Sequence, residues 1–185
     1  LGTVRRFAAG SGIARLATAI HDGDPDAVLD VLASGAADVA WIETPGEARD
    51  RRELAAVREL VVDSGRAVVA AARNGDADGA LAALDEVRVL TAHRHGPVGV
   101  DRWVPLIERW LSRAVDGFQP SRRFYVGRPV MVTRNDQRLR LYNGDVGVVV
   151  RAGDTVHVAF RGAEGARRFA PSRLEDLETV HAMTI

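Results

Sequence analysis

Two residue types are missing from this chain of 185 amino acids, and each absence excludes a class of chemistry. The chain has no cysteine, so disulfide bonds, thiol nucleophiles and thiolate metal ligands do not occur within it. All 25 basic residues are arginine. Without lysine, the chain cannot contain a Walker A phosphate loop, a Schiff-base lysine or a lysine general base.

Long apolar runs are also missing. No run approaches the length of a bilayer span, and the first ten residues, LGTVRRFAAG, lack the apolar segment and cleavage signal of a secretory peptide. We therefore expect a cytoplasmic location and no membrane partner. The formal net charge is zero, so total charge does not indicate nucleic acid, and any basic patch must be local.

The length and the 46% hydrophobic content fit one domain with an insert, or two small domains. Up to about residue 115, stretches with helical periodicity alternate with short apolar runs. Helices are expected to begin near Gly12 and at Pro25, with Asp24 capping the second. Further helices are expected over 45–73, 77–84 and 100–114, and strands over 39–42 and 87–91. This alternation predicts an α/β fold, a parallel sheet with helices on its faces.

After Pro120 the pattern changes to short strands separated by Gly, Asn and Asp. Strands are expected over 130–133, 139–142, 146–151, 155–160 and 167–169, with a turn over 171–174. Asn143-Gly144 tolerates positive φ and predicts a tight turn between strands. Such a series is typical of a small antiparallel barrel. The apolar run 179–185 predicts a strand of the larger sheet, and since the chain stops there without a cap or polar tail, we expect a fragment whose sequence continues.

Three segments together resemble a known family. They are 87–100 (VRVLTAHRHGPVGV), the block from GRPVMVTRND at 127–136 through LYNGDVG at 141–147, and the terminal HAMTI at 181–185. Their combination resembles the C-terminal motor region of the RecD family, superfamily 1 DNA helicases that form the α subunits of exodeoxyribonuclease V. The family's His-Lys-Ser-Gln-Gly motif would begin directly after residue 185.

The resemblance implies a division of the chain. Residues 1–126 would form part of the second RecA-like helicase domain, with a partial parallel sheet and flanking helices. Residues 127–177 would form an inserted small antiparallel β-barrel of Src-homology-3-like type, and residues 178–185 a strand that returns to the RecA-like domain.

The resemblance also implies a function, an ATP-dependent DNA helicase subunit acting in double-strand break repair and recombination. ATP and Mg would bind the intact protein in a cleft between two RecA-like domains, and single-stranded DNA would cross their top. RecB-like and RecC-like subunits would be its partners. This chain would supply one wall of the cleft, so alone it is expected to bind no cofactor and to hydrolyse no ATP.

Arg6 is the candidate catalytic and nucleotide-contacting residue. The sequence Val4-Arg5-Arg6-Phe7 is similar to the helicase motif whose arginine reaches the γ-phosphate of the nucleotide. A guanidinium offers a planar fork of donors to the charge that develops on a transferred phosphoryl group. The alternative is an ordinary surface arginine or a helix-flanking ion pair.

A second group of candidates lies at the end of the strand expected over 87–91. Ligands usually bind at the carboxyl ends of parallel strands, and Thr91, His93 and Arg94 could hold DNA phosphates there. Thr184, in the returning strand, is included with them. The alternative is a polar loop without a ligand, and two histidines at i, i+2 are a poor zinc set.

The densest basic stretch lies in the expected barrel and contains one aromatic residue. Its candidate DNA contacts are Arg128, Arg134, Asn135, Arg138, Arg140 and Tyr142. Cationic groups mixed with a stacking platform hold single strands without reading their sequence. Two alternatives remain: these arginines protect an edge strand from aggregation, or the chain is a non-catalytic nucleic-acid- or protein-binding module on a helical scaffold.

Overall fold

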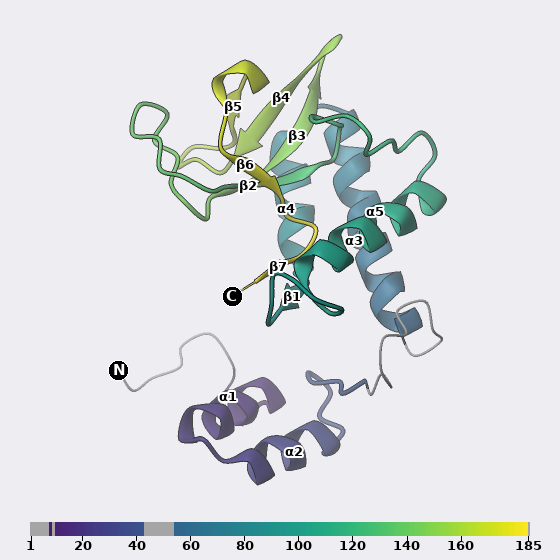
Figure 1. Cartoon of the computed structure of the whole chain (residues 1–185), viewed down its shortest axis with the longest axis vertical. Helices are drawn as coiled ribbons and strands as arrows, with labels where there is room; N and C mark the ends of the chain where they lie inside the picture. The colour runs from purple at the N-terminus through teal and green to yellow at the C-terminus, as the bar shows by residue number, and fades with distance from the viewer. Residues whose placement is uncertain (1–7, 9, 43–53, 185) are drawn as a thin grey trace. The chain divides into compact units, whose positions relative to one another are not determined.

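A computed structural model of the chain describes residue 8 and residues 10–42 and 54–184. They belong to two compact units, one within residues 1–54 and one within residues 55–185. Helices are combined with one parallel and one antiparallel sheet (Figure 1). The mixed helix-and-sheet composition expected from the sequence, with both kinds of sheet, is therefore confirmed.

The first unit contains helices α1 (Gly12–Asp22) and α2 (Pro25–Ala33). The Asp24 side chain accepts a hydrogen bond from Ala27 N, as expected for an N-cap followed by proline. The strand expected over 39–42 is wrong, because these residues lie in an irregular segment. Directly before it, Asp38 accepts hydrogen bonds from the first N–H groups of α1, and these bonds lower the pKa of its carboxyl.

The described part of the second unit contains three long helices. They are α3 (Ala55–Arg73), α4 (Ala77–Glu86) and α5 (Val100–Ala114). Of the helix expected over 45–73, residues 45–53 lie outside the described residues, and the rest runs unbroken through Gly65. A Cβ at Gly65 would collide with the Leu111 side chain, so glycine lets α5 approach α3 closely.

The contact between α3 and α5 forms an apolar core. Val61, Val69, Ile107 and Trp110 are buried in it. The rings of Trp110 and Trp103 meet edge to face, with centroids 6.2 Å apart. The two tryptophans, seven residues apart on α5, therefore serve packing.

The antiparallel sheet has five strands in the order β5-β4-β3-β2-β6. In chain order the strands are β2 (Pro129–Val132), β3 (Val146–Ala152), β4 (Thr155–Phe160), β5 (Arg167–Phe169) and β6 (Leu177–Thr179). A short 3₁₀ helix, η2 (Pro171–Arg173), joins β5 to β6. The strand expected over 139–142 is wrong: residues 136 and 141 form only an isolated bridge, because the Asp136 side chain accepts from Leu139 N and closes a turn.

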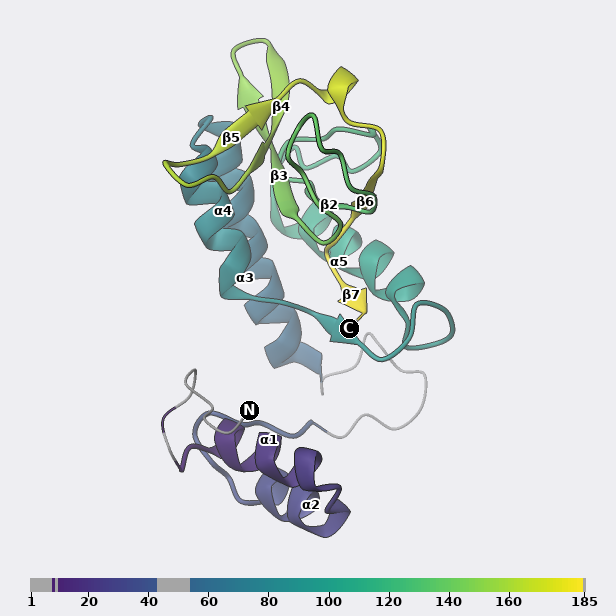
Figure 2. The ribbon, with the colours of Figure 1, turned by 90° about the vertical axis from the view of Figure 1, so that its left-hand side faces the viewer.

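The parallel sheet consists of two short strands that are far apart in the sequence of the second unit. Strand β1 (Leu90–Thr91) pairs with β7 (Met183–Thr184), so that Leu90 faces Met183 and Thr91 faces Thr184. Figure 2 shows this pair at one end of the unit and the antiparallel sheet at the other, with α3 running between them. Of the strand expected over 179–185, residues 183–184 form β7 in this two-stranded parallel sheet, whereas Thr179 is the last residue of β6 in the antiparallel sheet.

The antiparallel sheet packs directly on helices α3 and α4. Ala72 and Ala80 are fully buried against Val148, Val150 and Ala159 of strands β3 and β4. Small residues on the helices let the sheet come close, so the apolar side chains of the two layers are in direct contact.

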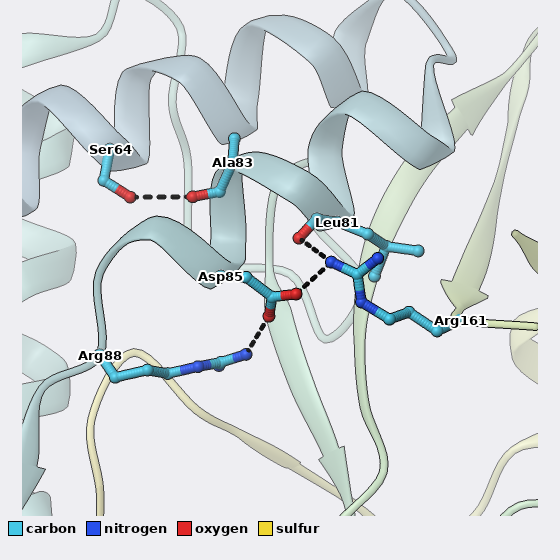
Figure 3. A network of polar contacts seen from close by, with 6 residues as sticks. All are labelled: Ser64, Leu81, Ala83, Asp85, Arg88 and Arg161. Atoms are coloured by element: carbon cyan, nitrogen blue, oxygen red, sulfur yellow. Dashed lines mark hydrogen bonds and ion pairs between the residues drawn. The ribbon is translucent and has the colours of Figure 1, made fainter. Parts of the chain in front are cut away.

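Polar contacts surround the joint, the packed contact of the antiparallel sheet with helices α3 and α4 (Figure 3). Arg161, which follows β4, donates to Leu81 O of α4 at 3.3 Å and to the Asp85 carboxylate, which also accepts from Arg88 at 2.7 Å. On β5, Arg168 donates to Gly75 O at 2.9 Å. These contacts make the sheet and the helices one structural body.

A partly buried polar network joins α5 to the segment between β6 and β7. The Tyr125 hydroxyl donates to Glu108 Oε1 at 2.8 Å and lies 2.9 Å from His181 Nε2. In the tautomer that carries its proton on Nε2, His181 donates to the Tyr125 oxygen, whose own proton is directed at the carboxylate. Burial, assisted by the charge of Arg128, lowers the pKa of His181 to about 3, so the imidazole is neutral in the folded chain.

Truncating Leu81 to alanine should destabilise helices and sheet together. Leu81 is 3% exposed within the joint, so Leu81→Ala should cost about 2–5 kcal/mol of unfolding free energy. Hydrogen exchange is expected to accelerate in α4 and in β3 and β4 alike. Leu60→Ala on α3, where Leu60 is 61% exposed, is the control and should change stability by less than about 0.5 kcal/mol. Loss of protection confined to α4 would contradict the shared joint.

His181 should make stability depend on pH. The unfolded chain protonates His181 near pH 6.5, whereas the folded chain does so only near pH 3. Stability from this residue is therefore complete above pH 6.5 and is lost as the pH falls towards 3, by roughly 1.4 kcal/mol per pH unit. In urea unfolding, His181→Gln should show a shallower decline between pH 6.5 and 4 than the parent chain. The exposed His93→Gln should keep the parent profile, and an unchanged profile in His181→Gln would show that His181 is not held neutral.

Candidate nucleic-acid interface

The carboxyl ends of β1 and β7 lie together because the two strands are parallel. Their last residues, Thr91 and Thr184, face each other in the register. Thr91 is buried, and its hydroxyl donates to His93 O at 2.8 Å, so it shapes the start of the following loop. The structure thus brings together two predicted site residues that are far apart in the sequence.

The loop after β1 is exposed and carries charged and imidazole side chains. His93 and Arg94 are both exposed. Arg94 Nη2 donates to Glu178 Oε1 of β6 at 2.7 Å, and this carboxylate raises the pKa of the Arg94 guanidinium. Next to it, His95 Nδ1 lies 2.6 Å from Asp101 Oδ2. The loop can present the Arg94 guanidinium to a ligand, but the Glu178 carboxylate of the antiparallel sheet already contacts this guanidinium.

Arg128 is placed differently from the other predicted contacts. It is 8% exposed, and its Nε donates to Thr179 Oγ1 at 2.9 Å, while Nη1 donates to Arg123 O. The guanidinium also lies over the Phe124 ring, 5.8 Å from its centroid. Burial lowers its pKa. These internal contacts give Arg128 a structural role in holding β2 to β6.

The segment between β2 and β3 displays the remaining candidates on its surface. Leu139 and Leu141 are buried and alternate with exposed Arg138, Arg140 and Tyr142. The two leucines therefore anchor the segment, and the side chains that alternate with them are exposed to solvent.

Hydrogen bonds fix the shape of the same segment. Asn135 Oδ1 accepts from Asn143 N at 2.8 Å, and Asp145 Oδ2 accepts from Tyr142 N at 2.8 Å. Gly144, at φ 93°, supplies the left-handed residue that the Asn-Gly turn requires. Asn135 thus helps to build the turn, and Asn143 to Asp145 are architectural, as expected. Arg134 stays exposed beside them.

A groove of about 360 Å³ lies between this segment and the chain that follows η2. Its apolar lining residues include Leu139, Leu141 and Leu174, which are buried. Its charged lining residues are Arg134, Arg138, Arg173, Asp136, Glu175 and Asp176. Arginines and carboxylates are equally numerous in this lining, so the groove as a whole is not a basic channel.

Some site features escape prediction from the sequence. Glu178 and Arg173 carry no local motif, and they join the site only because β6 and η2 fold back onto segments much earlier in the chain. Arg6 lies outside the described residues. Within residues 10–42 and 54–184, no three histidine or acidic side chains are grouped as metal ligands would be, and no helix there is long and apolar enough to cross a bilayer.

Comparison with known proteins connects this geometry to a family. No family model matches the chain. Over 100% of its length the chain is 46% identical to the RecBCD enzyme subunit RecD of Mycolicibacterium smegmatis, and 42% identical to that of Mycobacterium tuberculosis strain H37Rv.

A third relative, the RecBCD enzyme subunit RecD of Haemophilus influenzae, is 34% identical over 55% of the chain and 15% of its own length. The chain spans 31% of the length of each mycobacterial relative and matches their C-terminal region. The matches thus cover both sheets and all helices of the chain, and on this ground the chain belongs to the RecD family.

Proposed function

We propose that the chain is the C-terminal motor region of an ATP-dependent DNA helicase, the RecD subunit of an exonuclease V that acts in double-strand break repair and recombination. The observation that carries this proposal is the β1–β7 pair, which places Thr91 and Thr184 at one strand edge. The antiparallel sheet lies between these strands in the sequence. An insert of this kind is compatible with a motor sheet that leaves its ligand-binding edge free.

The expected domain division is part of the proposal. Residues 1–126 and 178–185 would belong to the second RecA-like domain, and 127–177 to a Src-homology-3-like barrel. The order β5-β4-β3-β2-β6, with a 3₁₀ turn between β5 and β6, supports the barrel assignment. Strand β6 extends to Thr179, so the barrel would end slightly later than the sequence indicates.

The single-stranded DNA grip would use two surfaces of the second unit. One is the β1–β7 edge with Thr184, His93 and Arg94; Thr91, predicted as a contact, is buried and shapes the loop instead. The other is the exposed face that carries Arg134, Arg138, Arg140 and Tyr142, where guanidinium groups would hold phosphates and the phenol ring would stack on a base. Arg128 is omitted from the grip because its guanidinium is buried.

ATP and Mg would bind the complete protein, with the Walker motifs supplied by a first motor domain. The contribution of this chain would be Arg6, whose guanidinium would stabilise charge on the transferred phosphoryl group. Closing and opening of the cleft would then step the strand along. RecB-like and RecC-like subunits are the proposed partners, and the cytoplasm the proposed location.

The grip can be tested with fluorescein-labelled oligodeoxythymidine and anisotropy. We expect binding that weakens with salt, with a log–log slope of about −0.7 per phosphate contacted. The double variant Arg134→Ala/Arg138→Ala should weaken binding about tenfold or more and make the slope shallower by about 1.4. Arg58→Ala, an exposed arginine of α3, is the control and should bind as the parent does. Equal losses in both variants would contradict a local grip.

The mixed charge of the groove favours one alternative, a module that docks a protein partner. Asp136, Glu175 and Asp176 would repel a polyanion, whereas a peptide with an apolar side chain and both charges would suit this lining. If the chain binds no oligodeoxythymidine at low salt but binds a purified RecB-like or RecC-like subunit in a salt-insensitive way, this alternative replaces the proposed grip.

The nucleotide role of Arg6 requires a complete motor. The chain alone should show no ATP turnover, because it lacks a Walker A lysine. In a chimera carrying this chain in place of the matching region of the Mycolicibacterium smegmatis RecD, Arg6→Ala should lower the ATPase kcat by about 10³-fold or more. Arg5→Ala is the matched control and should retain most activity. Turnover by the isolated chain, or equal effects of the two substitutions, would refute the role.

A further inference from the structure

We propose that Glu178 sets the DNA affinity of the loop after β1 by competing with phosphate for Arg94. This inference rests on the proposed function, since it takes the loop as part of the single-stranded DNA grip. It assigns a role to a residue of the antiparallel sheet that has no DNA-binding motif around it.

The geometry of the Arg94–Glu178 ion pair indicates that Glu178 can exchange with a phosphate and does not hold Arg94 permanently. Arg94 Nη2 and Glu178 Oε1 are 2.7 Å apart, a full charge-assisted hydrogen bond. Yet the side chains remain 54% and 42% exposed, so solvent and ions reach both of them. An exposed ion pair of this kind contributes little to stability and can exchange partners readily.

The surrounding charges make the Glu178 carboxylate the group that controls whether Arg94 is free to bind a phosphate. The neighbouring His95 lies against Asp101, and the Asp101 carboxylate also acts on Arg94. Arg94 and His95 therefore each have an acid beside them, and a phosphate must displace Glu178 before it gains a free guanidinium. The carboxylate would also repel a phosphate that approaches Arg94.

The position of Glu178 links the two sheets. Glu178 lies on β6, opposite Met131 of β2, and the chain leads from β6 into β7, whose last residue faces Thr91. Arg94 lies on the loop that follows Thr91. When Arg94 binds a DNA phosphate, its contact with Glu178 would break. The loop after β1 would then lose this contact with the antiparallel sheet.

The test compares the chain with Glu178→Gln, Arg94→Ala and the double variant in oligodeoxythymidine anisotropy. Glutamine keeps the shape and an acceptor but removes the charge, so Glu178→Gln should bind DNA about two- to fivefold more tightly. Arg94→Ala should bind more weakly, and adding Glu178→Gln to it should give no gain, because the competition requires both partners. Glu59→Gln, an exposed glutamate of α3, controls for net charge.

Each outcome decides the proposal. A gain in Glu178→Gln that vanishes without Arg94 and is absent in Glu59→Gln supports it. Parent-like affinity of Glu178→Gln, an equal gain in Glu59→Gln, or a gain that persists in the Arg94→Ala background overturns it while leaving the DNA grip intact. If neither the parent chain nor Glu178→Gln binds DNA, the proposed function fails and the inference fails with it. Unfolding curves of all variants verify that each one is folded.

Discussion

The rest of the structure depends on the close packing of strands β3 and β4 against helices α3 and α4. Ala72 and Ala80 let the sheet approach, and Val148, Val150 and Ala159 fill the contact. Through it, the antiparallel sheet, which carries the exposed arginines, takes a fixed position relative to the helices that flank the β1–β7 pair. Larger helix residues would hold the two layers apart, and Arg161 would lose its reach to Asp85. The candidate DNA-binding surfaces are thus positioned by apolar contacts that touch no ligand.

Arginine dominates the polar chemistry of the chain, and its residues lie in contrasting environments. Arg128 is enclosed and holds backbone and hydroxyl partners within the fold. Arg134 and Arg138 point to solvent beside the groove, where phosphates could reach them. The planar guanidinium suits both tasks, since it binds several acceptors at once and remains charged. A basic stretch in a sequence therefore does not by itself mark a binding surface.

Local patterns predict much of this fold. Helix α5 and strands β4 and β5 have the expected bounds, because their periodicity agrees with the packing they finally make. The stretch 138–142 misleads, since its alternation of exposed and buried residues is that of a strand, although the Asp136 side chain closes a turn there. The expected strand over 39–42 has an apolar composition but no pairing partner among the described residues. The ion pair of Arg94 with Glu178 is beyond local patterns, because only the complete topology brings these side chains together.

The pairing of β1 with β7 also constrains how the chain reaches its folded state. Leu90 meets Met183 only after almost all of the second unit has been synthesised, and closing so long a loop is entropically slow. The antiparallel strands β3 and β4 are joined by a short turn and can form early. During synthesis, β1 would therefore wait unpaired, with Leu90 exposed, until the inserted sheet had folded on α4. The insert would then act as an internal template that delivers β7 to its partner.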